Sequence, residues 1–148
     1  MAFKGVALFF IDKKIFLPSH GIFPSGIVVQ IEPILSCNLV KTELVDTINI
    51  ILKNGLKNLP DVTAEEWKNR KDPLLVATKM RSWKKLDINS IYYGLEWAND
   101  KIFLSFSNLN IKKRQEVDHE RTMTFTHDTN IDEIVEIILD DYSKFIKK

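Results

Sequence analysis

Residues 90–107 read SIYYGLEWANDKIFLSFS, and the rest of the chain is organised around this segment. Two runs rich in aromatic and branched side chains flank the polar residues 99–101, a pattern typical of two strands joined by a tight turn. In the second run, Ile102, Leu104 and Phe106 alternate with residues that would face the other way. Because an isolated hairpin is only marginally stable in water, the segment predicts that further strands and at least one helix cover its apolar face.

The N-terminal part of the chain predicts three strands. Residues 4–11 are almost all apolar, residues 12–14 form a polar turn, and residues 15–17 are apolar again, which indicates a first hairpin. Residues 27–37 predict a third strand, after a loop rich in proline and glycine. Pro33 lies inside that strand, so we expect an edge position, a bulge or a local break there, because proline cannot donate to a β-ladder.

Two segments change to the helical period and predict amphipathic helices. The first is expected to begin with Thr42 as its N-cap and to end near Asn54-Gly55. Its apolar stripe consists of Leu44, Val45, Ile48, Ile51, Leu52 and Leu56. The second lies near the C-terminus, with a stripe of Ile131, Ile134, Val135, Ile138, Tyr142, Phe145 and Ile146. Because each large apolar side chain contributes about 1.5–3 kcal/mol when fully buried, both helices are expected to lie on the sheet.

The connection between residues 61 and 87 is the least regular part of the sequence. Residues 63–66, Thr-Ala-Glu-Glu, match a capping box and predict a short helix that carries Trp67. Residues 74–77 are an apolar run too short to classify, and residues 82–86 are interpreted as another short helix or a turn. The connection is also locally basic, through Lys68, Arg70, Lys71, Lys79, Arg81, Lys84 and Lys85.

The order of these elements gives the fold class. A final strand is expected at residues 123–126, where Met123 and Phe125 alternate with threonines. The chain then consists of three strands and a helix, a mixed connection, and again three strands and a helix. We therefore predict a single α+β domain over residues 1–148, with an antiparallel sheet of about six strands in two three-stranded halves and two main amphipathic helices packed on it. No sequence repeat supports a true duplication.

The composition excludes several classes of protein. The 148 residues carry 21 basic and 20 acidic side chains, and this formal net charge of +1 provides no overall field for nucleic acid or an anionic membrane. No apolar segment is long enough to span a bilayer. The short N-terminal apolar run ends without a small-residue cleavage site, as expected of a strand rather than a signal peptide. A single cysteine, Cys37, excludes an internal disulfide and suits the reducing cytoplasm.

Catalytic and metal-binding motifs are scarce. The only metal candidate is Asp118-His119-Glu120 followed by His127-Asp128, but adjacent strand residues point to opposite faces, so a solvated charged turn is the favoured interpretation. Cys37 has no local activating charge, which favours an inert thiol. There is no glycine-rich phosphate loop, nucleophile elbow or paired-carboxylate motif. We expect no enzyme, no metal and no cofactor, although a site assembled from distant positions would escape motif reading.

Two kinds of binding protein remain. Residues 67–85 interleave basic side chains with Trp67 and Trp83, as surfaces that bind single-stranded nucleic acid do. Tryptophans in a connection, however, more often anchor it to the core. The acidic side chains of residues 116–120 and of the last helix could instead complement a basic protein partner, or could simply keep the surface soluble.

The residues from Asp72 to Ser107 carry a resemblance to a known family. Residues 73–75 (PLL), residues 79–86 (KMRSWKKL) and the aromatic hairpin follow one helix and precede a charged strand and a terminal helix. This succession resembles the small immunity proteins of bacterial contact-dependent growth inhibition and related polymorphic toxin systems. The resemblance covers most of the chain as an order of elements, and its most specific part is Ser82-Trp83-Lys84. It implies an α+β fold that in some members is similar to the Whirly domain.

The resemblance also implies a function. Such a protein is a cytoplasmic, non-enzymatic antidote that binds the C-terminal toxin domain of its own strain's effector, often a nuclease, and neutralises it stoichiometrically. The family has no shared contact motif, so no residue is carried over from it. Because a nuclease groove is expected to be basic, acidic residues would supply matching charge. The predicted toxin-binding residues are Glu96, Asp100, Glu116, Asp118 and Glu120. The alternative is a single-stranded nucleic-acid-binding protein that uses residues 67–85.

Overall fold

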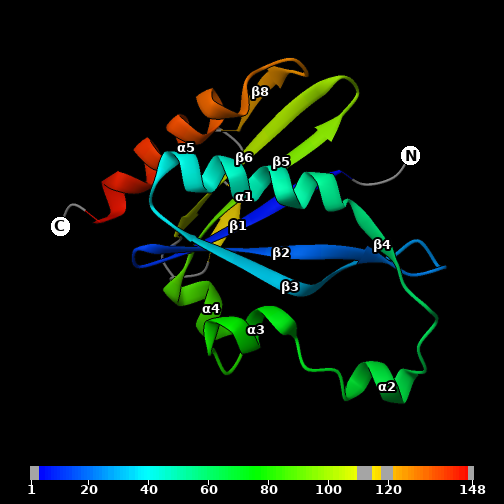
Figure 1. Cartoon of the computed structure of the whole chain (residues 1–148). Helices are drawn as coiled ribbons and strands as arrows, with labels where there is room; N and C mark the ends of the chain where they lie inside the picture. The colour runs from blue at the N-terminus through cyan, green and yellow to red at the C-terminus, as the bar shows by residue number, and fades with distance from the viewer. Residues whose placement is uncertain (1–3, 110–114, 118–121, 147–148) are drawn as a thin grey trace.

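The structure is a computed structural model, and it describes residues 4–109, 115–117 and 122–146 (Figure 1). The strands are β1 Gly5–Ile11, β2 Lys14–Ile22, β3 Val28–Asn38, β4 Leu56–Asn58, β5 Ile91–Ala98, β6 Lys101–Leu109, β7 Gln115–Val117 and β8 Met123–Thr126. The helices are α1 Lys41–Asn54, α2 Ala64–Lys68, α3 Pro73–Thr78, α4 Trp83–Asn89 and α5 Ile131–Ile146.

The strands form one open, largely antiparallel sheet, so the predicted α+β class is confirmed. The order along the sheet is β3-β2-β1-β5-β6-β7, with β8 also paired to β6 and the short β4 paired in parallel to β2. The predicted halves are β3-β2-β1 and β5-β6-β8, and they join through the antiparallel pair β1 and β5. Strands β4 and β7 were not predicted, because three-residue strands carry no readable alternation.

The hairpin predicted within residues 90–107 is confirmed as β5 and β6. Its two-residue turn, Asn99-Asp100, has positive φ at both positions, 53° and 62°, which is the geometry of the type I′ turns that match the twist of paired strands. Leu95 lies opposite Leu104 in the ladder, and both side chains are buried. The hairpin occupies the middle of the sheet, with β1 on one side and β7 and β8 on the other.

Helices α1 and α5 cover one face of this sheet, as predicted, and they lie beside each other in Figure 1. Their side chains in the hydrophobic core are Leu44, Ile48, Ile51, Ile134, Val135, Ile138 and Tyr142. These pack in one core with inward-facing strand residues such as Leu8, Tyr93 and Leu104. Burial of this apolar surface is the main force that holds the two helices on the sheet.

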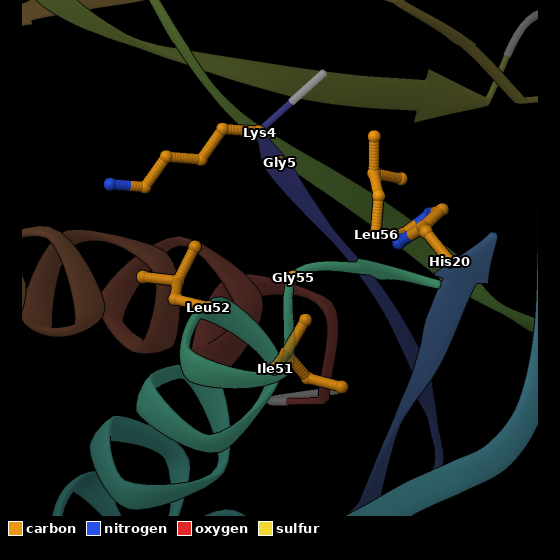
Figure 2. A pocket seen from close by; sticks show the side chains of 7 residues that line it. All are labelled: Lys4, Gly5, His20, Ile51, Leu52, Gly55 and Leu56. Atoms are coloured by element: carbon orange, nitrogen blue, oxygen red, sulfur yellow. The ribbon is translucent and has the colours of Figure 1, made fainter. Parts of the chain in front are cut away.

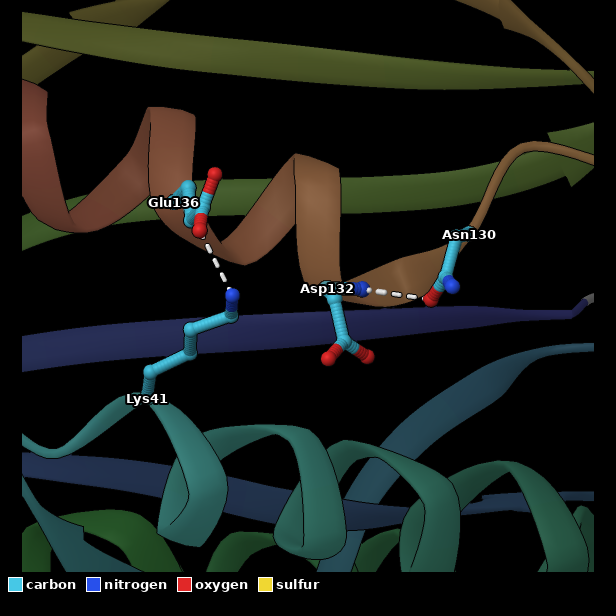
Figure 3. Close-up of polar contacts among 4 residues, drawn as sticks. All are labelled: Lys41, Asn130, Asp132 and Glu136. Atoms are coloured by element: carbon cyan, nitrogen blue, oxygen red, sulfur yellow. Dashed lines mark hydrogen bonds and ion pairs between the residues drawn. The ribbon is translucent and has the colours of Figure 1, made fainter.

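Polar contacts between α1 and α5 lie at the surface (Figure 3). Lys41 Nζ is 2.6 Å from Glu136 Oε1, and this hydrogen bond raises the pKa of the Lys41 amine. Nearby, the Asn130 side chain accepts a hydrogen bond from the Asp132 backbone N–H at the start of α5. Because exposed ion pairs contribute little to stability, we attribute the docking of the two helices to their apolar contacts.

The predicted N-cap of α1 is wrong, whereas the predicted end is confirmed. The extended residue before the helix is Val40, whose side chain cannot accept a hydrogen bond, and Thr42 already lies within the first turn. Strand β3 runs to Asn38, and the helix follows it directly. The N-cap is therefore residue 40, two positions before the predicted Thr42. At the other end, Gly55 has a φ of 61° and its N–H donates to the Ile51 carbonyl.

Short helices cover part of the opposite face. The capping box at Thr63 and Glu66 is confirmed and begins α2, and residues 73–78 and 83–89 form α3 and α4. Leu74 of α3 and Leu86 of α4 are buried in a second, smaller cluster with Ala7 and Phe9 of β1. The second face of the sheet is therefore covered where α3 and α4 lie, and α3 packs mainly against β3 and β2 (Figure 1).

Strands β1 and β2 pair only near their shared turn. Their ladder runs from Ile11 and Lys14 to Phe9 and Phe16 and does not continue beyond that pair. Beyond Phe16, β2 follows β3 and finally β4, while β1 continues along β5 (Figure 1). The register of β3 shifts opposite Pro18 and Ser19, beside Pro33, so the bulge and edge position expected for that proline are confirmed. The divergence of β1 and β2 leaves an opening in the sheet.

Candidate binding surfaces

A pocket of about 200 Å³ occupies the opening between β1 and β2 on the face opposite α1 and α5. We call it the β1–β2 pocket. Its lining comes from five strands and includes Ala7, His20, Gln30, Tyr92, Glu96 and Ser105. His20 and Gln30 lie opposite each other in the β2–β3 ladder, and Gly5 lies opposite Glu96 in the β1–β5 ladder. The pocket is therefore built by strand pairings that join distant parts of the sequence.

The polar groups of the β1–β2 pocket have distinct environments. Gln30 Oε1 is buried and accepts no hydrogen bond from the part of the chain that the structure describes. Burial, and then the nearby charge of Glu96, raise the pKa of the Tyr92 phenol. Burial lowers the pKa of the His20 imidazole. Glu96 itself is exposed at the rim, so near neutral pH the pocket combines one carboxylate with neutral polar groups.

A smaller pocket lies on the helix side of the same opening (Figure 2). Its volume is about 30 Å³, and Lys4, His20, Leu52 and Leu56 are among its lining residues. A space of this size is enough for one or two water molecules and no larger ligand. His20 lines both pockets, so both of them border this one residue of β2.

The burial of His20 predicts a pH dependence of stability. The folded state holds its pKa below the ordinary value of about 6.5, so the unfolded chain binds more protons as pH falls below 7. The free energy of unfolding is expected to decrease from pH 7.5 to pH 5.5, and His20→Gln should flatten this slope in urea titrations at the two values. His127→Gln, at an exposed position, is the matched control, and an unchanged slope in His20→Gln would contradict the prediction.

A second candidate surface is an apolar groove beside α2, which we call the Trp67 groove. Its volume is about 410 Å³, and Phe23, Ile27, Val62 and Trp67 line it together with Asp61. The Trp67 ring is 45% exposed, meets Phe23 edge-on at 5.8 Å between centroids and has the Arg70 guanidinium 5.1 Å from its centroid. Arg70 also donates to the Gln30 carbonyl. No side chain of α2 is buried, so these contacts hold the helix in place.

The two tryptophans of the basic segment lie on different parts of the molecule. Trp83 meets Phe9 at 6.3 Å between centroids and donates its Nε1–H to Asp72 at 3.0 Å. Phe9 pairs with Phe16, whereas Trp67 contacts Phe23, just beyond the end of β2. Residues 16 and 22 are six positions apart along β2, or about 20 Å. Residues 67–85 therefore do not present one continuous stacking surface.

The structure separates the predicted acidic residues. Glu96 lies at the rim of the β1–β2 pocket, and Asp100 is exposed in the hairpin turn. Glu116 pairs by its backbone with Asn108, and position 108 is seven residues along β6 from Lys101, or about 23 Å from the turn. Asp118 and Glu120 lie outside the described residues. The hairpin tip and the β7 strand are thus at opposite ends of β6, and toxin binding by these five residues stays a prediction.

The candidate catalytic groups of the sequence are placed as follows. Cys37 is buried, and burial raises the pKa of its thiol, as expected of an unreactive cysteine. Among the residues that the structure describes, no cluster of three or more His, Cys, Asp or Glu side chains has the geometry to hold a metal ion. The run Asp118-His119-Glu120 lies outside them. None of the described helices has the length and apolar character that crossing a membrane requires.

Sequence reasoning named Glu96 but missed the other polar residues of the β1–β2 pocket. The sequence around His20, Pro18-Ser19-His20-Gly21, predicts a loop, whereas the structure places these residues in β2. Gln30 was one polar residue in an apolar strand. The local sequence contains no sign that β1 and β2 diverge, since that depends on which strands pair. The bulge signal at Pro33 is the one feature that pointed to irregularity in this region.

Comparison with known proteins identifies the fold. No family model matches the chain, and no curated protein matches its sequence. A solved structure of a protein of unknown function from Neisseria meningitidis is similar, with a TM-score of 0.60 at 11% identity over 90% of each chain. A chain in the structure of a CdiA-CT/CdiI toxin and immunity complex from Yersinia pseudotuberculosis is also similar, with a TM-score of 0.60 at 10% identity over 92% of this chain and 93% of that one. At these identities the likeness is one of fold.

Proposed function

We propose that this chain is an immunity protein that binds a cognate toxin domain and neutralises it by forming a stoichiometric complex. The observation that carries the proposal is the fold shared with a chain of a toxin and immunity complex, over 92% of this chain and 93% of that one. A match that spans both chains concerns the whole arrangement of strands and helices rather than a common hairpin. The sequence resemblance through residues 72–107 points to the same family independently of the structure.

The two candidate surfaces are suited to different parts of a protein partner. The Trp67 groove offers exposed apolar and aromatic side chains of the kind that anchor protein interfaces. The β1–β2 pocket offers a carboxylate at its rim, which would complement the basic substrate groove of a nuclease. The toxin is proposed to be a nuclease, whose active site the immunity protein covers or flanks. Glu96 and Asp100, with Glu116, Asp118 and Glu120, remain the proposed acidic contacts.

The proposal is tested by growth of cells that express the C-terminal fragment encoded immediately upstream of this chain. We expect the fragment alone to arrest growth and co-expression of this protein to restore it. An immunity protein of a different toxin is the control and should give no rescue. The purified pair should elute as a one-to-one complex in size-exclusion chromatography. Toxicity that this protein does not relieve would contradict the immunity function.

Binding of single-stranded nucleic acid is the second candidate, and one observation favours it. Trp67 is exposed with the Arg70 guanidinium near its ring, a combination that stacks with bases. Against it stand the near-neutral net charge and the separation of Trp67 from Trp83. Retention of a labelled oligonucleotide that falls steeply with salt and is lost in Trp67→Ala would favour this candidate. No retention at low salt would exclude it.

A further inference from the structure

We propose that the β1–β2 pocket receives one arginine side chain of the toxin, with Glu96 and Gln30 as the groups that accept its hydrogen bonds. This inference rests on the proposed function, because it assigns a ligand to one surface of the proposed complex. It follows from the size, the charge and an unpaired acceptor of the pocket, which are taken in turn below.

The size of the pocket suits a single side chain. Small-molecule sites in proteins typically enclose about 300–1,000 Å³, and the β1–β2 pocket encloses about 200 Å³. One side of it is formed by the paired strands β1, β5 and β6 and the other by the paired strands β2 and β3, so ladder hydrogen bonds hold the backbone of each side. A long, narrow side chain delivered by a protein partner therefore fits this opening better than a free metabolite does.

The charge of the pocket favours a cation. Glu96 is the one acidic residue that lines it, and no lysine or arginine among the described residues does so. Lys4, the basic residue next to Gly5, is turned toward the Trp97 ring, with its Nζ 5.5 Å from the ring centroid. Arg70 is engaged with Trp67 and with the Gln30 carbonyl. An incoming positive charge would thus meet an acidic site that no lysine or arginine in the described part of the chain already neutralises.

The buried oxygen of Gln30 distinguishes arginine from lysine. A buried acceptor without a donor costs free energy, which a partner can recover by supplying the donor. Gln30 Oε1 is such an atom, and Gln30 is one of the residues that line the pocket together with Glu96. A guanidinium carries five N–H donors in a planar fork and can donate to two acceptors at once, whereas an ammonium acts as a point charge.

Gly94 shapes the wall of the pocket. A Cβ added at this position would lie 2.6 Å from the Tyr92 hydroxyl oxygen and 3.1 Å from Tyr92 Cζ. The missing side chain therefore allows the Tyr92 phenol to lie across β5 as one side of the opening. Any larger residue at position 94 would push the phenol away and change the shape of the site.

The test uses the purified toxin fragment and charge-neutral variants of this protein. Glu96→Gln keeps the shape of the rim and is expected to weaken the complex by about 10- to 100-fold in isothermal titration, the range for losing a hydrogen bond to a charged group. Gln30→Leu should weaken it by about tenfold, provided that its circular dichroism and melting curve match those of the wild type. Asp46→Asn, at an exposed acidic residue of α1 on the opposite face of the sheet, is the matched control and should bind within twofold.

Variants of the toxin fragment identify the arginine that enters the pocket. Each arginine of the fragment is replaced by lysine and by alanine, and each variant is titrated against the wild type and against Glu96→Gln. For the inserted arginine alone, the two losses should not add, because both changes remove the same contact. If Glu96→Gln binds like the wild type, or if its loss adds fully to that of every arginine variant, the inference is wrong while the immunity function stands.

A probe without the toxin separates this inference from the proposed function. Ethylguanidinium is titrated into the full-length protein and followed by the amide signals of Gly94 and Ser105, with ethylammonium and ethylurea as the lysine-like and neutral comparisons. We expect saturable shifts with ethylguanidinium alone, retained in Asp46→Asn and lost in Glu96→Gln. If these shifts are observed but the toxin fragment does not bind the protein, the pocket is still a site for a guanidinium group. The inference that the toxin supplies this group would then be wrong. Equal responses to all three probes would overturn the cation pocket.

Discussion

Ile48→Ala is expected to lower the free energy of unfolding by about 2–5 kcal/mol, the range for truncating a fully buried isoleucine. Ile48 lies in the middle of α1 and is 0% exposed, in the core shared by the sheet and both long helices. The loss combines transfer of the removed methylene and methyl groups with the cavity that remains. Thermal unfolding should show a melting temperature lower by about 5–20 °C for a chain of this size.

Ile50→Ala is the matched control, because it makes the same change in the same helix. Ile50 is 48% exposed, so its truncation should change stability by less than about 0.5 kcal/mol. The two variants should therefore differ by several degrees in melting temperature although their compositions are identical. Equal losses in both variants would contradict the placement of α1 with Ile48 toward the sheet.

Tyr93→Phe is expected to destabilise the protein by about 1–3 kcal/mol, because it removes a donor from a buried polar group. Tyr93 is 0% exposed, and its hydroxyl donates to Asp141 Oδ2 at 2.5 Å from β5 to α5. The Asp141 carboxyl is itself only 4% exposed, so water cannot fully replace the lost hydrogen bond. Urea denaturation of both proteins measures the difference directly.

Asp141→Asn and Asp140→Asn separate this contact from a general effect of acidic residues on α5. Asp141 is buried against the hairpin, whereas its neighbour Asp140 is exposed. Asp141→Asn should be destabilising, and the combination with Tyr93→Phe should cost less than the sum of the two single changes, because both act on one hydrogen bond. Full additivity would show that the two side chains do not depend on each other.

The packing of Ile48 and the hydrogen bond between Tyr93 and Asp141 join the hairpin to the two long helices. The hairpin held in this way supports the proposed interface. The outer face of the hairpin carries Glu96 and Gly94 at the β1–β2 pocket, while its inner face holds Tyr93 and Leu95 in the core. A site on paired strands keeps its geometry when a partner approaches. The Trp67 groove differs, since α2 has no buried side chain and is held mainly by the contacts of Trp67 and Arg70.

Much of the fold could be predicted because the deciding signals are local. The alternation of residues 102–106 and the turn at Asn99-Asp100 specify a hairpin through side-chain periodicity and positive φ. The capping box at Thr63 and the glycine at position 55 place the start of α2 and the end of α1. The N-cap of α1 was mispredicted because the end of β3, and not the local preference of Thr42, sets where that helix begins. The likeness to a Whirly domain stays a prediction.

Much less of the candidate site could be predicted from the sequence. Charge alone suggested Glu96, and the sequence could not distinguish it from Asp100, although one lines a pocket and the other lies in a turn. His20 and Gln30 reach the same pocket because β2 leaves β1 after Phe16 and continues along β3. That divergence is a property of strand pairing across the chain, and no window of neighbouring residues contains it.

The strands of the central hairpin, the two amphipathic helices and the α+β class follow from the sequence alone, because periodicity and turn chemistry act between residues close in the chain. Three features emerge only in the folded chain: β1 and β2 separate, Glu96 borders a pocket, and Trp67 and Trp83 lie apart. These features depend on contacts between residues far apart in the chain, which form when apolar faces are buried together.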